Sequence, residues 1–239
     1  MSLTPVPVLP AYGPGNLTGI VPALMAPPAE RPDWVPEPAR TAEQVVLLVL
    51  DGLGWLQLQD RAALAPSLVG LIGGAATSVV PTTTACALTS LVVGAPPAAH
   101  GVVGYRVVVD GPTGPEVMNV LKWKTVSGDA RPFVDPDTFQ SLDPFGGRPV
   151  PVVSKAAFAG TAFTDAHQRG ARQVGWYETS GVAVDVAAQV AQGDPFVYAY
   201  YDGIDRIAHI YGFDAHYDAE LVAADRLVGD LLATLPAEV

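Results

Sequence analysis

The sequence predicts an α/β fold built on a mainly parallel sheet with helices on both faces. Two short apolar runs, residues 45–50 and 196–201, each end in an Asp-Gly pair. Unbroken apolar runs of this length are typical of parallel strands that are covered on both faces. Segments with helical periodicity alternate with such runs, as the crossover connections of a parallel sheet require. We expect residues 45–50 to form a central, doubly buried strand.

The remaining elements follow from the same patterns and from the turn residues between them. Further strands are predicted over residues 77–80, 102–109, 116–123, 151–154 and 171–177. The second and third of these flank Asp110-Gly111 and are predicted to form a hairpin. Helices are predicted over residues 60–73, where Pro66 could divide the helix, and over 81–93, 161–169, 181–192 and 214–234. Residues 127–149 are rich in Asp, Pro and Gly and are expected to be loop.

The N-terminal part differs in composition from the rest of the chain. The first 40 residues contain 10 of the 23 prolines. Proline fixes φ and removes a backbone donor, so residues 1–40 are expected to form an extended, irregular strap. A proline-motif ligand is the alternative. Residues 41–239 are then expected to form the main domain.

Charge and composition exclude several classes of protein. The chain has 13 Lys and Arg against 24 Asp and Glu, a formal net charge of −11. A nucleic-acid polymer or an anionic membrane would need a basic face, so neither is expected as a partner. A small anionic substrate is compatible, because one bound metal ion can reverse the local field. No leader or membrane-spanning run is visible, which predicts a soluble cytoplasmic protein.

Two groups of residues could bind or transform an anion at one edge of the sheet. Asp51 ends the strand at 45–50, where it could be a metal ligand or a cap of the next turn, and both alternatives stay open. Thr84 lies in the run Thr82–Thr84 at the start of a helix, and one of these three threonines is expected to cap that helix. The hydroxyl of Thr84 could also act as a metal-activated nucleophile beside a bound phosphate. Because ligands collect at the carboxyl ends of parallel strands, Asp51, Asp202 and the turn at 82–84 are expected to converge.

Asp205 and His209 follow the second buried strand at a spacing of four residues. On a helix this spacing places both side chains on one face, and both are good zinc ligands. An isolated pair of this kind is also common as a surface ion pair. Asp202 lies nearby and competes for the same role.

The other histidines and the single cysteine are assigned structural or solvated roles. His100 precedes a loop glycine and is expected to be structural. His167 is expected to be solvated on a polar helix face, and His216 at a solvated helix start. Cys86 is expected to be buried, and one cysteine excludes an intrachain disulfide.

Two segments together resemble a known family. The segments VLLVLDGLGW and PTTTACALTSLVVGAPPAAHGVVGY resemble the type I phosphodiesterase (nucleotide pyrophosphatase/phosphodiesterase) branch of the alkaline phosphatase superfamily. YYDGIDRIAHIYG resembles its Asp-x-x-x-His metal motif, onto which Asp205 and His209 fall. The dense match covers roughly residues 44–106 and 196–212.

The resemblance implies an alkaline-phosphatase-like fold and a phosphoryl-transfer site. Asp51 would bind one of two zinc ions, Thr84 would be the nucleophile on that ion, and Asp205 and His209 would bind the other. Two ions ~3.5–4 Å apart would stabilise the attacking and leaving oxygens during hydrolysis of nucleotide phosphodiester or pyrophosphate bonds through a phospho-threonine intermediate. The substrate would be a small phosphate ester or nucleotide.

The sequence also departs from the family pattern. Ala87 stands where well-known members have Asn, and Tyr105 replaces an Asn that contacts the phosphate, with Arg106 beside it as a second substrate contact. The family's later Asp-His pair and final His have no match, so we expect an incomplete catalytic domain that binds zinc weakly and is nearly inactive alone.

The departures leave two other functions open. One is a phosphonate or phosphomonoester hydrolase on the same scaffold, and the other is a non-catalytic α/β binding domain. Manganese would accept the same ligands as zinc. A sulfatase is disfavoured, because the Cys/Ser-x-Pro-x-Arg motif is absent.

Overall fold

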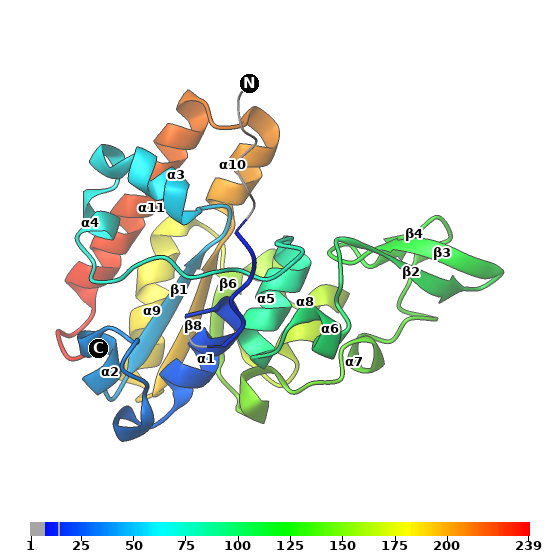
Figure 1. The fold of residues 1–239 in the computed structure, drawn as a ribbon, viewed down its shortest axis with the longest axis horizontal. Helices are drawn as coiled ribbons and strands as arrows, with labels where there is room; N and C mark the ends of the chain where they lie inside the picture. The colour runs from blue at the N-terminus through cyan, green and yellow to red at the C-terminus, as the bar shows by residue number, and fades with distance from the viewer. Residues whose placement is uncertain (1–7, 14) are drawn as a thin grey trace. The chain divides into compact units, whose positions relative to one another are not determined.

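The computed structural model describes residues 8–13 and 15–239 (Figure 1). The chain divides into two compact units that interleave in sequence. We call Leu24–Gly74, Arg148–Ala159 and Gly170–Val239 the sheet unit. We call Met1–Ala23, Ala75–Gly147 and Gly160–Arg169 the hairpin unit. The predicted boundary between residues 40 and 41 stays a prediction.

The sheet unit is built on four parallel strands in the order β1-β8-β6-β7. These strands are β1 (Val45–Leu50), β8 (Phe196–Tyr201), β6 (Pro151–Lys155) and β7 (Arg172–Trp176). All four were predicted, but the central position of β1 was wrong. Among the described residues, β1 pairs with β8 alone and is only half-buried, whereas all six residues of β8 are buried. Apolar side chains indicate covered faces, but strand order depends on distant pairing partners.

Helices flank this sheet and complete the core of the unit. They are α3 (Trp55–Asp60), α4 (Pro66–Val69), α9 (Val182–Ala191), α10 (Gly203–Tyr211) and α11 (Ala215–Thr234). The 3-10 turns η2 (Ala62–Leu64), η4 (Ala156–Phe158) and η5 (Thr179–Gly181) accompany them. Apolar side chains of α9 and α11 pack with β6 and β8 in one cluster. An α/β architecture with a parallel sheet is therefore confirmed.

The segment predicted to be helical over 60–73 is divided, and a new helix begins at Pro66, the residue expected to divide it. The chain forms α3, η2 and α4 in succession. Arg61 and Ala65 leave the helical region at φ −120° and −133°. Pro66 can only begin a new helix, because it has no N–H to donate to the preceding turn.

The hairpin unit holds a second, antiparallel sheet in the order β2-β3-β4-β5. Its strands are β2 (Arg106–Gly111), β3 (Gly114–Asn119), β4 (Lys124–Thr125) and β5 (Gly128–Asp129). The predicted hairpin is confirmed, with Gly111 opposite Gly114 at its turn. The expected strand at 77–80 is wrong, since Thr77 makes only an isolated bridge to Asn16.

Four short helices complete this unit. They are α5 (Thr84–Val93), α6 (Pro97–His100), α7 (Pro136–Phe139) and α8 (Ala162–Gln168). The predicted end of α5 is confirmed, because Gly94 follows it with φ 69°. Residues 127–149, expected to be loop, contain β5, α7 and the turn η3 (Pro144–Gly147).

The expectation of an extended strap over residues 1–40 is wrong where the chain is described; residues 1–7 and 14 lie outside the described residues. Helix α1 (Leu17–Met25), the turn η1 (Pro28–Glu30) and helix α2 (Glu37–Thr41) occupy much of it. The carboxamide of Asn16 accepts hydrogen bonds from the Thr18 backbone N–H (3.0 Å) and hydroxyl (2.9 Å). This cap starts α1 despite the nearby prolines. No described helix is long and apolar enough to cross a bilayer.

Candidate active site

The sequence-predicted site residues fall into both compact units. Asp51, Asp205 and His209 belong to the sheet unit, whereas Thr84, Tyr105 and Arg106 belong to the hairpin unit. Each group is therefore described within its own unit.

A close backbone approach joins the end of β1 to the start of α10. The N–H of Asp205 donates to the carbonyl oxygen of Asp51 at 3.0 Å. Gly52 directly follows Asp51 and has φ +80°. A Cβ on Gly52 would lie 2.4 Å from Cα of Asp205. Only glycine permits both this conformation and this approach. The backbones of Asp51 and Asp205 are thereby brought together at the carboxyl edge of the sheet, whereas the expected convergence with the turn at 82–84, which belongs to the other unit, stays a prediction.

The carboxylate of Asp51 has a hydroxyl partner on the neighbouring strand. The hydroxyl of Tyr200 donates to Oδ2 of Asp51 at 2.7 Å, and Tyr200 is buried. Burial and the negative charge of Asp51 raise the pKa of Tyr200. The phenol therefore stays protonated and keeps its proton for this bond.

Asp205 and His209 lie on one face of α10, as their spacing predicts. Nε2 of His209 is 3.5 Å from Oδ1 of Asp205. The imidazole is 79% exposed and the carboxylate 31% exposed, so solvent ions can reach the pair. Burial raises the pKa of Asp205, His209 opposes that shift, and Asp202 adds to it.

The competing carboxylate, Asp202, is already engaged by a cation. Nζ of Lys155 lies 2.5 Å and 2.7 Å from its two oxygens, and both side chains are largely buried. The same ammonium lies over the rings of Trp176 (5.4 Å) and Phe158 (5.9 Å). This pairing leaves Asp205 as the better placed ligand of the two.

Lys155 and Tyr200 were missed by sequence reasoning. Both sit at or near the carboxyl ends of predicted strands, and the rule that drew attention to Asp51 applies to these positions too. Their partners lie on other strands, so only the register of the sheet reveals them.

In the hairpin unit, Thr84 is the first residue of α5. The preceding Thr83 occupies the N-cap position but makes no side-chain cap bond, so the expected threonine cap is wrong. Its hydroxyl is directed instead at Sγ of Cys86, 3.3 Å away. A helix start whose cap residue makes no such bond leaves backbone N–H groups available to an anion.

Tyr105 and Arg106 lie on the surface of the hairpin unit. The Tyr105 hydroxyl accepts a hydrogen bond from the Asn119 amide at 2.6 Å, and Tyr105 is 37% exposed. Arg106 begins β2 opposite Asn119 and is exposed. Both side chains are accessible, as a substrate contact requires.

His100 and Cys86 are structural, as predicted. Nδ1 of His100 accepts the N–H of Val102 at 3.1 Å, so Nε2 carries the proton directed to the Ser90 hydroxyl, 2.7 Å away. Burial lowers the pKa of His100 to about 4. Cys86 is a fully buried free thiol whose pKa is raised by burial.

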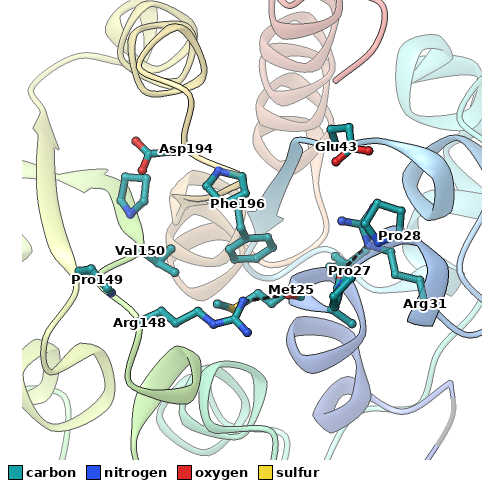
Figure 2. A pocket seen from close by; sticks show the side chains of 14 residues that line it. Met25, Pro27, Pro28, Arg31, Glu43, Arg148, Pro149, Val150, Asp194 and Phe196 are labelled. Atoms are coloured by element: carbon teal, nitrogen blue, oxygen red, sulfur yellow. Dashed lines mark hydrogen bonds between the residues drawn. The ribbon is translucent and has the colours of Figure 1, made fainter.

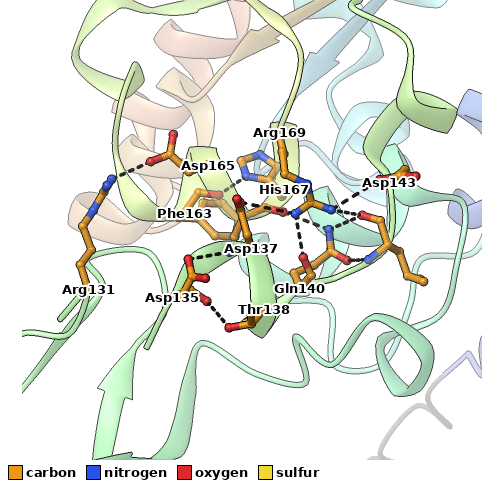
Figure 3. A network of polar contacts seen from close by, with 12 residues as sticks. Arg131, Asp135, Asp137, Thr138, Gln140, Asp143, Phe163, Asp165, His167 and Arg169 are labelled. Carbon is orange, nitrogen blue, oxygen red and sulfur yellow. Dashed lines mark hydrogen bonds and ion pairs between the residues drawn. The ribbon is translucent and has the colours of Figure 1, made fainter. Parts of the chain in front are cut away.

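The predicted solvent exposure of His167 was wrong. Its ring is buried and stacks on Phe163 with centroids 4.1 Å apart, and Nδ1 lies 2.6 Å from the Phe163 carbonyl oxygen (Figure 3). Most of α8 is buried, so this helix has little polar face. Burial lowers the pKa of His167 to about 4. His216 is exposed on the first turn of α11, as predicted.

A separate pocket of about 520 Å³ opens at the amino edge of the parallel sheet (Figure 2). Met25, Phe196 and several prolines line it, and Arg148 donates to the Met25 carbonyl oxygen at 3.0 Å. None of the predicted site residues lines this pocket.

The potential metal donors of the sheet unit match zinc in type but are few. Carboxylate and imidazole are ligand types that zinc takes, and Asp205 and His209 present one of each on one helix face. Among the described residues, no three His, Cys, Asp or Glu side chains are gathered so that they could hold an ion. The donors therefore fit zinc in type and supply only part of a coordination sphere.

Comparison with known proteins identifies a family that matches the chain. Residues 45–239 match the family model described as type I phosphodiesterase / nucleotide pyrophosphatase. A search of curated proteins found none that matches the chain.

Proposed function

Since the chain belongs to the type I phosphodiesterase / nucleotide pyrophosphatase family, we propose that it hydrolyses small nucleotide phosphodiesters or pyrophosphates with a metal ion and Thr84 as nucleophile. Membership of this family makes the protein a hydrolase of phosphate esters. The metal dependence, the phospho-threonine step and the cytoplasmic compartment are the finer parts of the proposal.

One observation carries the assignment of the metal-binding residues. The Gly52 turn brings the backbones of Asp51 and Asp205 into contact at 3.0 Å, although the two residues are far apart in sequence. A glycine that admits such an approach at the carboxyl edge of a parallel sheet supports a ligand site there. Asp51 would hold one zinc ion, and Asp205 with His209 the other. These donors supply only part of the coordination sphere of each ion.

In the proposed reaction, Oγ of Thr84 attacks phosphorus in line with the leaving group. The Oγ–P bond forms, the P–O bond to the leaving group breaks, and the hydroxyl proton is lost to solvent. Water then attacks the phosphorus, the Oγ–P bond breaks, and Thr84 regains a proton. Bound zinc would favour the deprotonated hydroxyl and neutralise developing charge. Tyr105 and Arg106 would donate hydrogen bonds to phosphate oxygens.

Thr84 can be tested against its neighbour Thr83. We expect zinc-dependent hydrolysis of bis(4-nitrophenyl) phosphate by the 239-residue chain, faster than that of the monoester or a phosphonate ester. Thr84→Ala should lower turnover by at least about 100-fold, because it removes the attacking oxygen. Thr83→Ala should stay within about twofold, since Thr83 makes no cap bond. Slow turnover suffices, because the comparison is between variants of one chain.

Other outcomes would contradict the proposal. Retained activity in Thr84→Ala would exclude the phospho-threonine step. Full activity after chelation would exclude the metal. Preference for the monoester or phosphonate would favour the alternative hydrolase on the same scaffold.

A further inference from the structure

The hydroxyl of Tyr200 donates to Asp51, and the proposed function assigns no role to this hydrogen bond. We propose that Tyr200 is a positioning residue that fixes the carboxylate of Asp51 for metal binding. This inference rests on the proposed function, in which Asp51 is a zinc ligand. It assigns a role to a residue of β8 that acts only through Asp51.

The backbone places the two side chains in a fixed relation. In the register of β1 and β8, Tyr200 is opposite Val49, and the N–H of Asp51 donates to the carbonyl oxygen of Tyr201 at 2.9 Å. The end of β1 is therefore locked to the end of β8. Alternation along the strand puts Tyr200 and Tyr201 on opposite faces of the sheet.

The ring of Tyr200 is held as firmly as its backbone. Tyr200 is only 7% exposed, and its ring lies against that of Phe158 with centroids 6.1 Å apart. A buried ring has few rotamers, so its hydroxyl occupies one place. From that place it donates to Oδ2 of Asp51 at 2.7 Å.

A donor at this position changes how Asp51 can bind a cation. The bond to Oδ2 holds the carboxylate in one orientation, so less side-chain freedom is lost when an ion binds. Removing a hydrogen bond from a neighbouring group to a ligating side chain typically lowers the affinity for the metal by about 10- to 100-fold. A purely structural hydroxyl would instead contribute to folding and leave the affinity for zinc unchanged.

The adjacent tyrosine is a matched control. Tyr201 is also buried at the end of β8, its ring packs against Trp176 (6.1 Å between centroids), and its hydroxyl donates to Glu220. Tyr200→Phe and Tyr201→Phe therefore each remove one buried hydroxyl that is bonded to a carboxylate. Of these two hydroxyls, that of Tyr200 is bonded to Asp51 and that of Tyr201 to Glu220.

The test is calorimetric titration of zinc into the 239-residue chain, with circular dichroism of each metal-free variant as the check on folding. The variants are Tyr200→Phe, Tyr201→Phe, Asp51→Asn and the double variant Asp51→Asn/Tyr200→Phe. Asp51→Asn should remove one zinc site. At that site, we expect Tyr200→Phe to lower the affinity for zinc by about 10- to 100-fold. Tyr201→Phe should change it by less than about twofold. In the Asp51→Asn background, Tyr200→Phe should add nothing, because its effect passes through Asp51.

The outcomes separate this inference from the proposed function. If Asp51→Asn weakens zinc binding but Tyr200→Phe does not, the positioning role is wrong and the assignment of Asp51 stands. The positioning role is also wrong if Tyr200→Phe weakens binding equally with and without Asp51. If the unmodified chain binds no zinc, or Asp51→Asn leaves binding unchanged, both the metal assignment and the inference fail.

Discussion

At the scale of single residues, Gly52 imposes the strictest requirement near the candidate site. Its φ of +80° is costly for other residues, and a Cβ would lie 2.4 Å from the backbone of Asp205. We predict that Gly52→Ala lowers the free energy of unfolding by about 3 kcal/mol, from left-handed strain and from overpacking against backbone. Urea denaturation followed by circular dichroism measures this change.

Gly170 separates the two causes. It has the same φ of +80° in the same unit, but nothing lies within 4 Å of a Cβ built there. Gly170→Ala should therefore show the conformational cost alone, about 1 kcal/mol. Equal losses in the two variants would mean that the approach of Gly52 to Asp205 is not a constraint.

At the scale of elements, α4 depends on a residue of another helix. The carboxylate of Asp225 on α11 accepts the backbone N–H groups of Ser67 (3.2 Å) and Leu68 (2.8 Å). Asp225 is buried, and Ala65 at the N-cap position offers no side-chain acceptor. We predict that Asp225→Ala costs about 2 kcal/mol, because it leaves two N–H groups without their acceptor. Protection of these two amides from hydrogen exchange should fall with the free energy of unfolding.

The exposed Asp230 on the same helix is the control. Asp230→Ala should stay within about 0.5 kcal/mol, as surface changes usually do. A comparable loss in both variants would attribute the effect to α11 itself rather than to the start of α4.

This contact also shows why some elements were predictable and others were not. Two of the four strands of the sheet unit, β1 and β8, are unbroken apolar runs, and all four were found from local sequence. The break of the 60–73 segment into shorter helices is supported by Asp225, a partner 157 residues away from Leu68. Pro66 indicates the break locally, but no window of sequence around α4 contains the partner Asp225.

The candidate site divides in the same way. The common face of Asp205 and His209 follows from helical spacing, which is local, and the structure bears it out. Tyr200 and Lys155 were missed because Asp51 and Asp202 reach them only through strand register. The burial of His167 was missed because it depends on what packs against α8.

At the scale of the whole molecule, the four histidines are distributed unevenly. His100 and His167 are buried in the hairpin unit, whereas His209 and His216 are exposed in the sheet unit. Burial lowers the pKa of both buried rings from 6.5 to about 4. Between these values the unfolded chain binds more protons than the folded one, so stability is complete above about pH 6.5 and is lost as the pH falls toward 4.

We therefore predict that acid destabilises the hairpin unit before the sheet unit. Each buried histidine contributes up to about 3 kcal/mol to this loss, by the linkage between pKa and stability. Trp123 reports on the hairpin unit, because its indole N–H donates to the Val134 carbonyl oxygen at 2.8 Å and the other three tryptophans belong to the sheet unit. Its indole proton should exchange faster between pH 6.5 and 4, as followed by nuclear magnetic resonance, while that of Trp176 stays protected.

Variants test whether the two histidines cause this pH dependence. His100→Asn and His167→Asn should each lower stability at neutral pH but flatten its fall with acidification, because asparagine does not titrate. An unchanged slope in the two buried variants would assign the acid sensitivity to carboxylates instead, and Trp123 and Trp176 would then lose protection together.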